Sequence, residues 1–200
     1  MKITILLAHP DKKSFNCAIA EAAVKAAEAN GHDVRFHDLY KEKFPPELPA
    51  AEIPRKARLP RIIQQHCDEL AEADGIVIVH PNWWGQPPAI LKGWIDRVLR
   101  PGVAYGFEET DVLGEGDLVG LLKAETVLVF NTSNTKPERE TGVYGDPLEL
   151  LWKNNLVVSC GVKQCYRQVF RVVVTSTPEQ RKYWLTEVGE AVNKYFPAEP

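Results

Sequence analysis

The chain has 200 residues, of which 44% are hydrophobic, and a formal net charge of −3 at pH 7. We expect residues 1–200 to form a single domain, because a chain of this length buries a substantial core without disulfides or metals. The weak negative charge and the lack of any long run of lysine and arginine argue against nucleic acid and anionic membrane surfaces as partners.

The cysteines indicate the redox compartment. Cys17, Cys67, Cys160 and Cys165 form no Cys-x-x-Cys pair and have no metal-ligand spacing with histidine. We therefore expect reduced thiols, no metal site and a cytoplasmic protein. The apolar run at residues 3–8 is too short for a signal peptide or a membrane span, so an integral membrane protein is not expected.

Short apolar runs alternate with helical patterns along the whole chain. In chain order, the first predicted elements are a strand at residues 3–8, a helix at 15–30, a strand at 33–39, a helix at 61–73 and a strand at 75–80. They are followed by a helix from Pro88 to about residue 99, a strand at 126–131, a helix at 147–158, a strand at 168–175 and a final helix that begins at the Thr177-Pro178 capping motif. This α/β alternation predicts a parallel sheet covered on both faces. We expect a flavodoxin-like, doubly wound, five-stranded sheet with strand order 2-1-3-4-5.

Two segments do not fit this alternation. Residues 41–60 are rich in proline and charge, and residues 101–120 are rich in glycine and acid. We expect both to be surface excursions that serve as lids or subunit contacts.

In a doubly wound sheet the ligand lies beyond the carboxyl ends of the strands, where the loops after the first, third and fourth strands meet. The first loop contains His9 and leads through Ser14, Phe15 and Asn16 into a helix, whose free amides and positive dipole end attract an anion such as phosphate. It contains no glycine-rich phosphate motif. Ser14 is equally explained as a plain N-cap, and His9 as a hydrogen-bonded turn residue.

The second and third loops supply different chemistry. Pro81, Asn82, Trp83 and Trp84 follow the third strand, and the adjacent tryptophans offer a flat apolar wall, although they could also fill a core or an interface. The third loop places small polar residues after an apolar strand, where they can bond the edge of a heteroaromatic ring: Asn131, Thr132, Ser133 and Asn134. Together the three loops describe a site for a flat, nucleotide-like ligand such as a flavin.

These motifs resemble those of the flavodoxin-like NAD(P)H:quinone oxidoreductases, a family that includes DT-diaphorase and the potassium-efflux ancillary oxidoreductases. His9-Pro10 with Ser14-Phe15-Asn16 resembles the phosphate-binding segment of the family. The most distinctive block runs from Trp83-Trp84-Gly85 through residues 88–98 to Ala104-Tyr105. The resemblance covers most of the chain.

The resemblance implies a flavin whose ring lies against Asn82, Trp83 and Trp84, with residues 131–134 at its pyrimidine edge and its phosphate near the first loop. It also implies a homodimer with each active site near the subunit boundary. NAD(P)H would give a hydride to the flavin, and an acceptor such as a quinone would then take its place. FMN is favoured as the flavin, with FAD as the alternative.

The chain departs from the family pattern at one position. Tyr144 stands where the resemblance leads us to expect a histidine that assists charge movement, and the family's accompanying tyrosine has no clear equivalent here. We expect Tyr144 to donate a hydrogen bond to the flavin or the acceptor, the alternative being a loop anchor.

Three functions remain open from the sequence. The first is a flavin-dependent NAD(P)H oxidoreductase acting on quinones or similar electrophiles. The alternative is a regulatory ancillary subunit of a potassium-efflux antiporter with the same flavin site. A one-electron carrier of the flavodoxin type is disfavoured, because the serine- and threonine-rich phosphate loop and the acidic docking face are missing.

Overall fold

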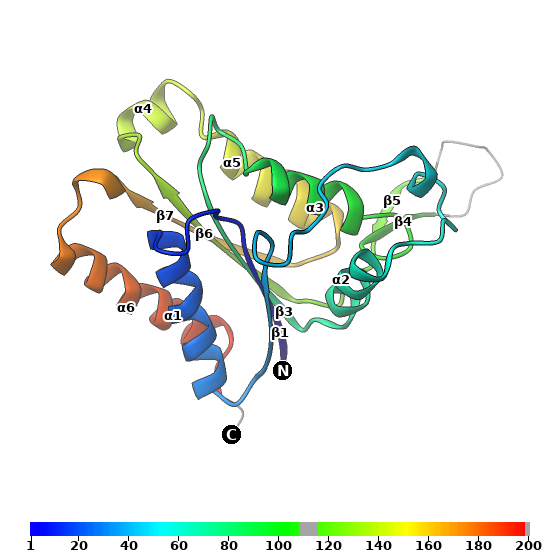
Figure 1. The fold of residues 1–200 in the computed structure, drawn as a ribbon, viewed down its shortest axis with the longest axis horizontal. Helices are drawn as coiled ribbons and strands as arrows, with labels where there is room; N and C mark the ends of the chain where they lie inside the picture. The colour runs from blue at the N-terminus through cyan, green and yellow to red at the C-terminus, as the bar shows by residue number, and fades with distance from the viewer. Residues whose placement is uncertain (109–115, 199–200) are drawn as a thin grey trace.

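The computed structural model describes residues 1–108 and 116–198. Its central sheet has five parallel strands in the order β2-β1-β3-β6-β7 (Figure 1). The strands of this sheet are β1 (Lys2–Leu7), β2 (Asp33–Asp38), β3 (Gly75–Pro81), β6 (Thr126–Ser133) and β7 (Gln164–Arg171). Numbered within this sheet alone, the order is 2-1-3-4-5, so the predicted doubly wound topology is confirmed.

Helices cover both faces of the sheet (Figure 1). One face carries α1 (Phe15–Ala29) and α6 (Pro178–Tyr195), which pack against each other. The other face carries α2 (Arg61–Glu72), α3 (Ala89–Val98), the short α5 (Pro147–Glu149) and its π-helical continuation η2 (Leu150–Val157). A bilayer-spanning helix, which must be long and apolar, is not found among the described residues.

Side-chain alternation along the central strands builds the two core layers. On β3, Val77 and Val79 pack with α1 and α6, whereas Ile76 and Ile78 pack with α2 and α3. Every residue of β3 and β6 is buried, as expected for strands covered on both faces.

The fifth strand begins and ends earlier than predicted. The apolar pattern placed it at residues 168–175, but β7 spans Gln164–Arg171, and Val173–Thr175 form the 3₁₀ turn η3. β7 is an edge strand that pairs only with β6 and is largely half-buried, so its first residues are polar and carry a weak strand signal. The six-residue helix α4 (Pro137–Gly142) was also missed, because its sequence PERETG has no apolar stripe.

The segment at residues 41–60 lies largely at the surface, as predicted, but buried contacts that the sequence did not reveal anchor it. Phe44 is buried, and the 3₁₀ turn η1 (Ala50–Glu52) places the Glu52 carboxylate in a buried ion pair with Arg97 of α3. The Arg97 Nε donates to Glu52 Oε2 at 3.0 Å, and Arg100 Nη2 donates to the Glu52 carbonyl at 2.9 Å. The segment is therefore fixed across α3.

The second excursion contains regular structure. The strands β4 (Tyr105–Phe107) and β5 (Leu118–Gly120) pair antiparallel in a separate small sheet. Residues 109–115, which join the two strands, lie outside the described residues.

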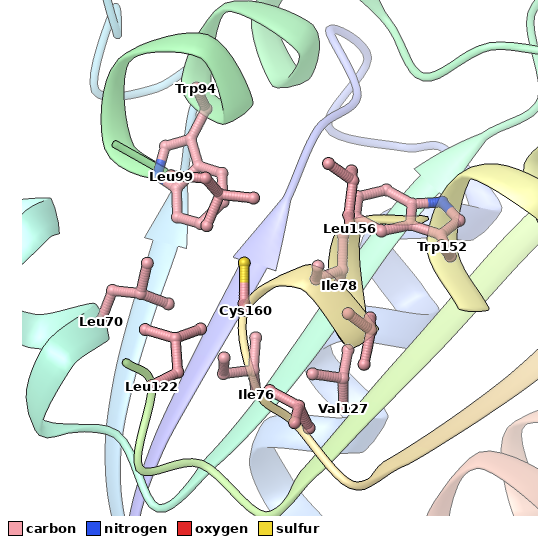
Figure 2. A pocket seen from close by; sticks show the side chains of 12 residues that line it. Leu70, Ile76, Ile78, Trp94, Leu99, Leu122, Val127, Trp152, Leu156 and Cys160 are labelled. Carbon is pink, nitrogen blue, oxygen red and sulfur yellow. The ribbon is translucent and has the colours of Figure 1, made fainter. Parts of the chain in front are cut away.

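A small apolar cavity of about 30 Å³ lies between the sheet and the helices on the α2–α3 face (Figure 2). Aliphatic side chains, two tryptophans and a thiol line it: Leu70, Ile76, Ile78, Trp94, Leu99, Leu122, Val127, Trp152, Leu156, Val157, Cys160 and Val162. Both indole N–H groups are occupied elsewhere, since Trp94 donates to His66 and Trp152 to His80. The cavity gives a water molecule no strong polar partner, so we expect it to be dry.

Candidate active site

The three predicted loops meet in one pocket of about 300 Å³ beyond the carboxyl ends of β1, β3 and β6. The residues that line it are His9, Ser14, Phe15, Asn16, Pro81, Asn82, Trp83, Thr132, Ser133, Asn134, Thr135 and Val173. All the cofactor-binding residues predicted from the sequence are among them except Trp84 and Asn131. The pocket lies between the ends of β1 and β3, where the strand order reverses.

The first loop presents the start of α1 to this pocket. Ser14 caps the helix, because its Oγ accepts a hydrogen bond from the Cys17 amide at 3.3 Å, and it also lines the pocket. The first turn of α1 contains no acidic residue, so no carboxylate there offsets the positive end of the helix dipole. His9 is a hydrogen-bonded turn residue, since its Nδ1 accepts from the Asp11 amide at 3.1 Å.

The Asn16 side chain has a structural role that the sequence did not reveal. It is buried, and its Nδ2 donates to Thr132 Oγ1 at 2.9 Å. This bond ties the first loop to the third loop. What Asn16 offers to an anion is therefore its backbone amide at the helix start rather than its side chain.

The aromatic loop is exposed, so the interpretation that its tryptophans fill the core is wrong. The Trp83 side chain is 43% exposed and faces the pocket, with its ring centroid 6.0 Å from that of His9. Asn82 holds the turn, because its amide donates to the Thr132 carbonyl at 2.7 Å and its Oδ1 accepts from the Gly85 amide at 2.8 Å.

Trp84 lies outside the first pocket, contrary to the prediction. Its backbone is left-handed, with φ of 58°, and its side chain is fully exposed. This turn directs Trp84 to a second, adjacent pocket of about 520 Å³. The residues that line the second pocket are Asn82, Trp84, Gly85, Thr135, Glu140, Tyr144 and Pro147, so Asn82 and Thr135 belong to both.

Asn131 also does not line the first pocket. Its side chain is fully buried and bonds His80 and Arg167 instead of facing the pocket. Alternation along β6 explains the difference, because Asn131 projects to the opposite face of the sheet from Thr132. The other polar groups of this loop are partly satisfied locally, since Ser133 Oγ accepts from the Thr135 amide and Asn134 Oδ1 accepts from the Val174 amide.

Tyr144 lines the second pocket and is half-exposed. Its hydroxyl oxygen accepts a hydrogen bond from Arg139 Nε at 2.6 Å, which leaves the hydroxyl proton available to a ligand. Tyr144 is thus placed beside Trp84 and apart from the residues of the first pocket.

Glu140 was not predicted. It is almost fully buried, accepts a hydrogen bond from Asn82 Nδ2 and pairs with Arg171 at 2.9 Å. No local pattern marks this glutamate, because α4 (PERETG) has no apolar stripe and both partners of Glu140 are distant in the sequence.

His80 was also missed, because it looks like the polar end of a buried strand. Its Nε2 accepts from Trp152 Nε1 at 3.0 Å, and since an indole N–H can only donate, the ring proton is assigned to Nδ1, which donates to the Pro81 carbonyl at 2.8 Å. Complete burial, together with the charge of Arg167 and against the opposing hydrogen bond to the Pro81 carbonyl, lowers the pKa of His80 to about 4. The ring is therefore neutral at neutral pH.

A second cluster of titratable groups lies away from both pockets. His37, Glu42 and His66 bring ligand-type atoms within 4.8 Å of one another. However, Trp94 donates to His66 Nδ1 at 3.0 Å, so the His66 proton lies on Nε2, which faces Glu42 at 3.1 Å and has no free electron pair for a metal. The cluster is satisfied as a hydrogen-bond and ion-pair network.

Comparison with known proteins supports the sequence-based assignment. A family model described as a flavodoxin-like fold matches residues 1–190. An uncharacterized NAD(P)H oxidoreductase of Haemophilus influenzae is 38% identical over 175 residues, covering 85% of this chain and 83% of that protein. The ribosyldihydronicotinamide dehydrogenase [quinone] of Rattus norvegicus is 31% identical over 222 residues, covering 100% of this chain and 94% of that protein.

Among solved structures, the NAD(P)H:quinone oxidoreductase from Methanothermobacter marburgensis superposes with a TM-score of 0.83 at 26% identity, covering 96% of this chain and 97% of that one. The sheet topology, the match to the family model over almost the whole chain and these relatives agree. The chain therefore belongs to the family with the flavodoxin-like fold.

Proposed function

We propose that this chain is a flavin-dependent NAD(P)H oxidoreductase that transfers hydride from NAD(P)H, through a bound flavin, to quinones or similar electrophilic acceptors. The observation that carries the proposal is the convergence of three loops of different chemistry on one pocket at the switch point of the sheet. The names of the relatives support the same reaction class.

The residues of the first pocket fit a flavin. Trp83 offers an exposed aromatic face for a ring system, and the acid-free first turn of α1 offers amide donors and a positive dipole end to a phosphate. Thr132, Ser133 and Asn134 provide polar groups at the opposite wall. When bound, a flavin supplies the hydride chemistry, while the protein binds and orients it.

The second pocket is proposed to hold the nicotinamide and, in turn, the acceptor. It adjoins the first pocket at Asn82, and exposed Trp84 and Pro147 give it an apolar wall. We propose that Tyr144, as the catalytic residue, donates its hydroxyl proton in a hydrogen bond to the group bound there. Arg139 holds the tyrosine oxygen in place for this role.

FMN is proposed as the flavin in preference to FAD. The lining of the first pocket ends at the start of α1, which provides a single anion position. FMN carries one phosphate group and no adenine. Separating the flavin released from the purified protein by chromatography distinguishes the two cofactors.

A homodimer is proposed from the exposed apolar residues around the second pocket. Trp84, Val143, Tyr144 and Leu150 are all at least half-exposed and lie close together in or beside the loops that line this pocket. A second copy of the chain would cover them. Sedimentation equilibrium tests this proposal, and a monomer at micromolar concentration would contradict it.

The domain and compartment assignments also remain proposals. We propose a single domain because both hydrophobic clusters flank one sheet. We propose a cytoplasmic protein because all four cysteines are free thiols, and burial raises the pKa of Cys67, Cys160 and Cys165 to about 11. The role of an ancillary antiporter subunit is not favoured, since the similar proteins named above are oxidoreductases.

Steady-state oxidation of NADH and NADPH by the flavin-loaded protein, with a soluble quinone as acceptor, tests the reaction. We expect turnover that requires both the flavin and the quinone. A flavin-loaded protein that oxidises neither nucleotide would contradict the proposed function.

A further inference from the structure

Arg167 is a buried arginine on β7 whose side chain bonds in two directions. Its side chain is 2% exposed. The Nε donates to Asn131 Oδ1 at 2.6 Å, and Nη1 donates to Asp146 Oδ2 at 2.8 Å and to Glu149 Oε2 at 2.9 Å. One guanidinium therefore joins the end of β6 to the start of α5.

In the direction of β3, Arg167 fixes a chain of oriented groups. Because a guanidinium can only donate, the Asn131 oxygen must face Arg167, so its amide nitrogen faces His80 Nε2 at 2.8 Å. His80 Nε2 thus receives Asn131 as a second donor beside Trp152, and its Nδ1 donates to the Pro81 carbonyl at 2.8 Å. Pro81 is the last residue of β3, directly before Asn82 and the tryptophan loop.

In the direction of α5, Arg167 holds a strained residue. Asp146 has φ of 45° and ψ of 71°, the left-handed conformation that residues other than glycine adopt at a cost. Its amide donates to the Glu140 carbonyl at 2.9 Å, and its Oδ1 caps α5 by accepting from the Glu149 amide at 3.3 Å. Its Oδ2 is held by Arg167. Asp146 stands between Tyr144 and Pro147, which both line the second pocket.

We propose that Arg167 is a positioning residue, which sets the separation of the two walls of the second pocket without touching its contents. One wall is the tryptophan loop, reached through Asn131, His80 and Pro81. The other wall is the loop at residues 143–147, reached through Asp146. This inference rests on the proposed function, because it assigns the second pocket to the nicotinamide and the acceptor.

The competing explanation is that Arg167 only neutralises the carboxylates of Asp146 and Glu149. A lysine would supply the same charge, but its single ammonium cannot reproduce the fork that spans Asn131 and Asp146. The two explanations therefore differ in what Arg167→Lys restores.

The experiment compares Arg167→Met, Arg167→Lys and Asp146→Asn with the wild type. The matched control is Arg35→Met, which removes an arginine from β2, the opposite edge strand, where it pairs with Glu72. Five quantities are measured: hydrogen exchange of the amides at residues 143–146 in the flavin-free protein, the ¹⁵N shifts of the His80 ring, the dissociation constant of FMN, kcat and KM.

For Arg167→Met we expect faster exchange of the amides at residues 143–146 and a changed ¹⁵N shift of His80 Nε2, because the freed Asn131 side chain no longer has to donate to it, while Trp152 still keeps the ring proton on Nδ1. We also expect kcat/KM to fall by roughly 10- to 100-fold, the effect of misplaced binding groups, while the dissociation constant of FMN changes by less than about threefold. Arg167→Lys should restore exchange protection only in part and should not restore the His80 Nε2 shift. Asp146→Asn should loosen the loop while leaving His80 unchanged, and Arg35→Met should change none of these readouts.

Two results would overturn the proposal. One is amide exchange at residues 143–146 in Arg167→Met that matches that in Arg35→Met. The other is full recovery of the His80 Nε2 shift and of kcat/KM in Arg167→Lys, which would reduce Arg167 to a neutralising charge. If the wild type bound no flavin, the proposed function would fail, and the exchange and ¹⁵N measurements would still decide whether Arg167 positions the two walls.

Discussion

Trp83 and Trp84 are neighbours in the sequence, but they serve different pockets. Trp83 faces the first pocket with His9, whereas the left-handed backbone of Trp84 directs its side chain to the second pocket. Stacking on a ring system can therefore be tested separately for each residue.

Trp83→Ala should weaken FMN binding by about tenfold, because an aromatic stacking partner contributes ~1–2 kcal/mol. Trp84→Ala is the matched control and should mainly raise the KM of NAD(P)H or the quinone. Fluorescence titration with FMN measures the first effect. Equal FMN affinity in the wild type and both variants would count against the assigned ring wall.

At Tyr144, the side-chain hydroxyl is the only group that a phenylalanine would remove. Tyr144→Phe should lower kcat by roughly tenfold, the loss of one hydrogen bond to the reacting group, and leave the FMN dissociation constant unchanged. Arg139→Gln serves as a comparison, because it removes the group that holds the hydroxyl oxygen but keeps the hydroxyl itself. Wild-type kcat in Tyr144→Phe would reduce Tyr144 to a loop anchor.

At the scale of elements, residues 41–60 show how two buried side chains anchor a surface segment to the core. The segment crosses α3 and is held there by the pair of Glu52 and Arg97, whose side chains are each 4% exposed. A close approach of Pro46 to Gly93 adds to this anchoring, since a Cβ built at Gly93 would lie 2.2 Å from the Pro46 carbonyl oxygen. The segment is therefore fixed to α3, the helix that follows the tryptophan loop in the chain.

Glu52→Gln should lower the free energy of unfolding by ~3 kcal/mol, because it leaves the Arg97 charge buried without its partner. Lys92→Met, at the exposed pair of Lys92 and Asp96, should cost less than ~0.5 kcal/mol. Denaturant titration gives both values. Similar values for the two variants would show that the buried pair does not anchor the segment.

A second network ties the same segment to β2 and α2. Glu42 accepts from His37 at 3.0 Å and from His66 at 3.1 Å, and His37 also bonds Glu69 at 2.5 Å. Burial lowers the pKa of His37, but the hydrogen bonds and charges of Glu42 and Glu69 outweigh it and raise the pKa above 6.5. Burial raises the pKa of Glu42, but its bonds to His37 and His66 lower it to about 2.

These shifts predict the pH dependence of stability. The contribution of His37 is complete below pH 6.5 and is lost as the pH rises through the raised pKa of the folded protein, whereas that of Glu42 is complete above pH 4.5 and is lost as the pH falls toward about 2. Glu69→Gln should lower the pKa of His37 and move the alkaline loss to lower pH. Denaturant titrations from about pH 5 to about pH 9 measure this loss of stability. An unshifted alkaline limb in Glu69→Gln would contradict this account.

At the scale of the whole molecule, the alternation of apolar runs and helical patterns predicted the topology. Local sequence patterns did not predict the features that depend on contacts with distant residues. The apolar runs that form β1, β3 and β6 predicted the number and the parallel direction of the central strands. In the folded chain these strands bring the three loops together. β7 was misplaced because an edge strand is half-buried and starts with polar residues. The strand propensity of a segment does not indicate whether that strand will lie at the edge of the sheet.

The residues around the site also divide into those that the sequence could predict and those that it could not. Ser14 and Trp83 could be predicted, because a helix start and an exposed aromatic turn have local signatures. Glu140, His80 and Arg167 could not, since their partners include residues 21 to 72 positions away in the chain. A buried charge network is specified by the folded neighbours and leaves no periodic signal in the sequence.

We expect the first pocket to hold a flavin that accepts hydride from NAD(P)H. The visible absorption spectrum of the purified protein, titrated with FMN and then with NADPH under anaerobic conditions, tests it most directly. We predict a bound flavin spectrum that bleaches on adding NADPH and returns on adding a quinone. A protein whose spectrum shows no bound flavin at any FMN concentration would contradict the account.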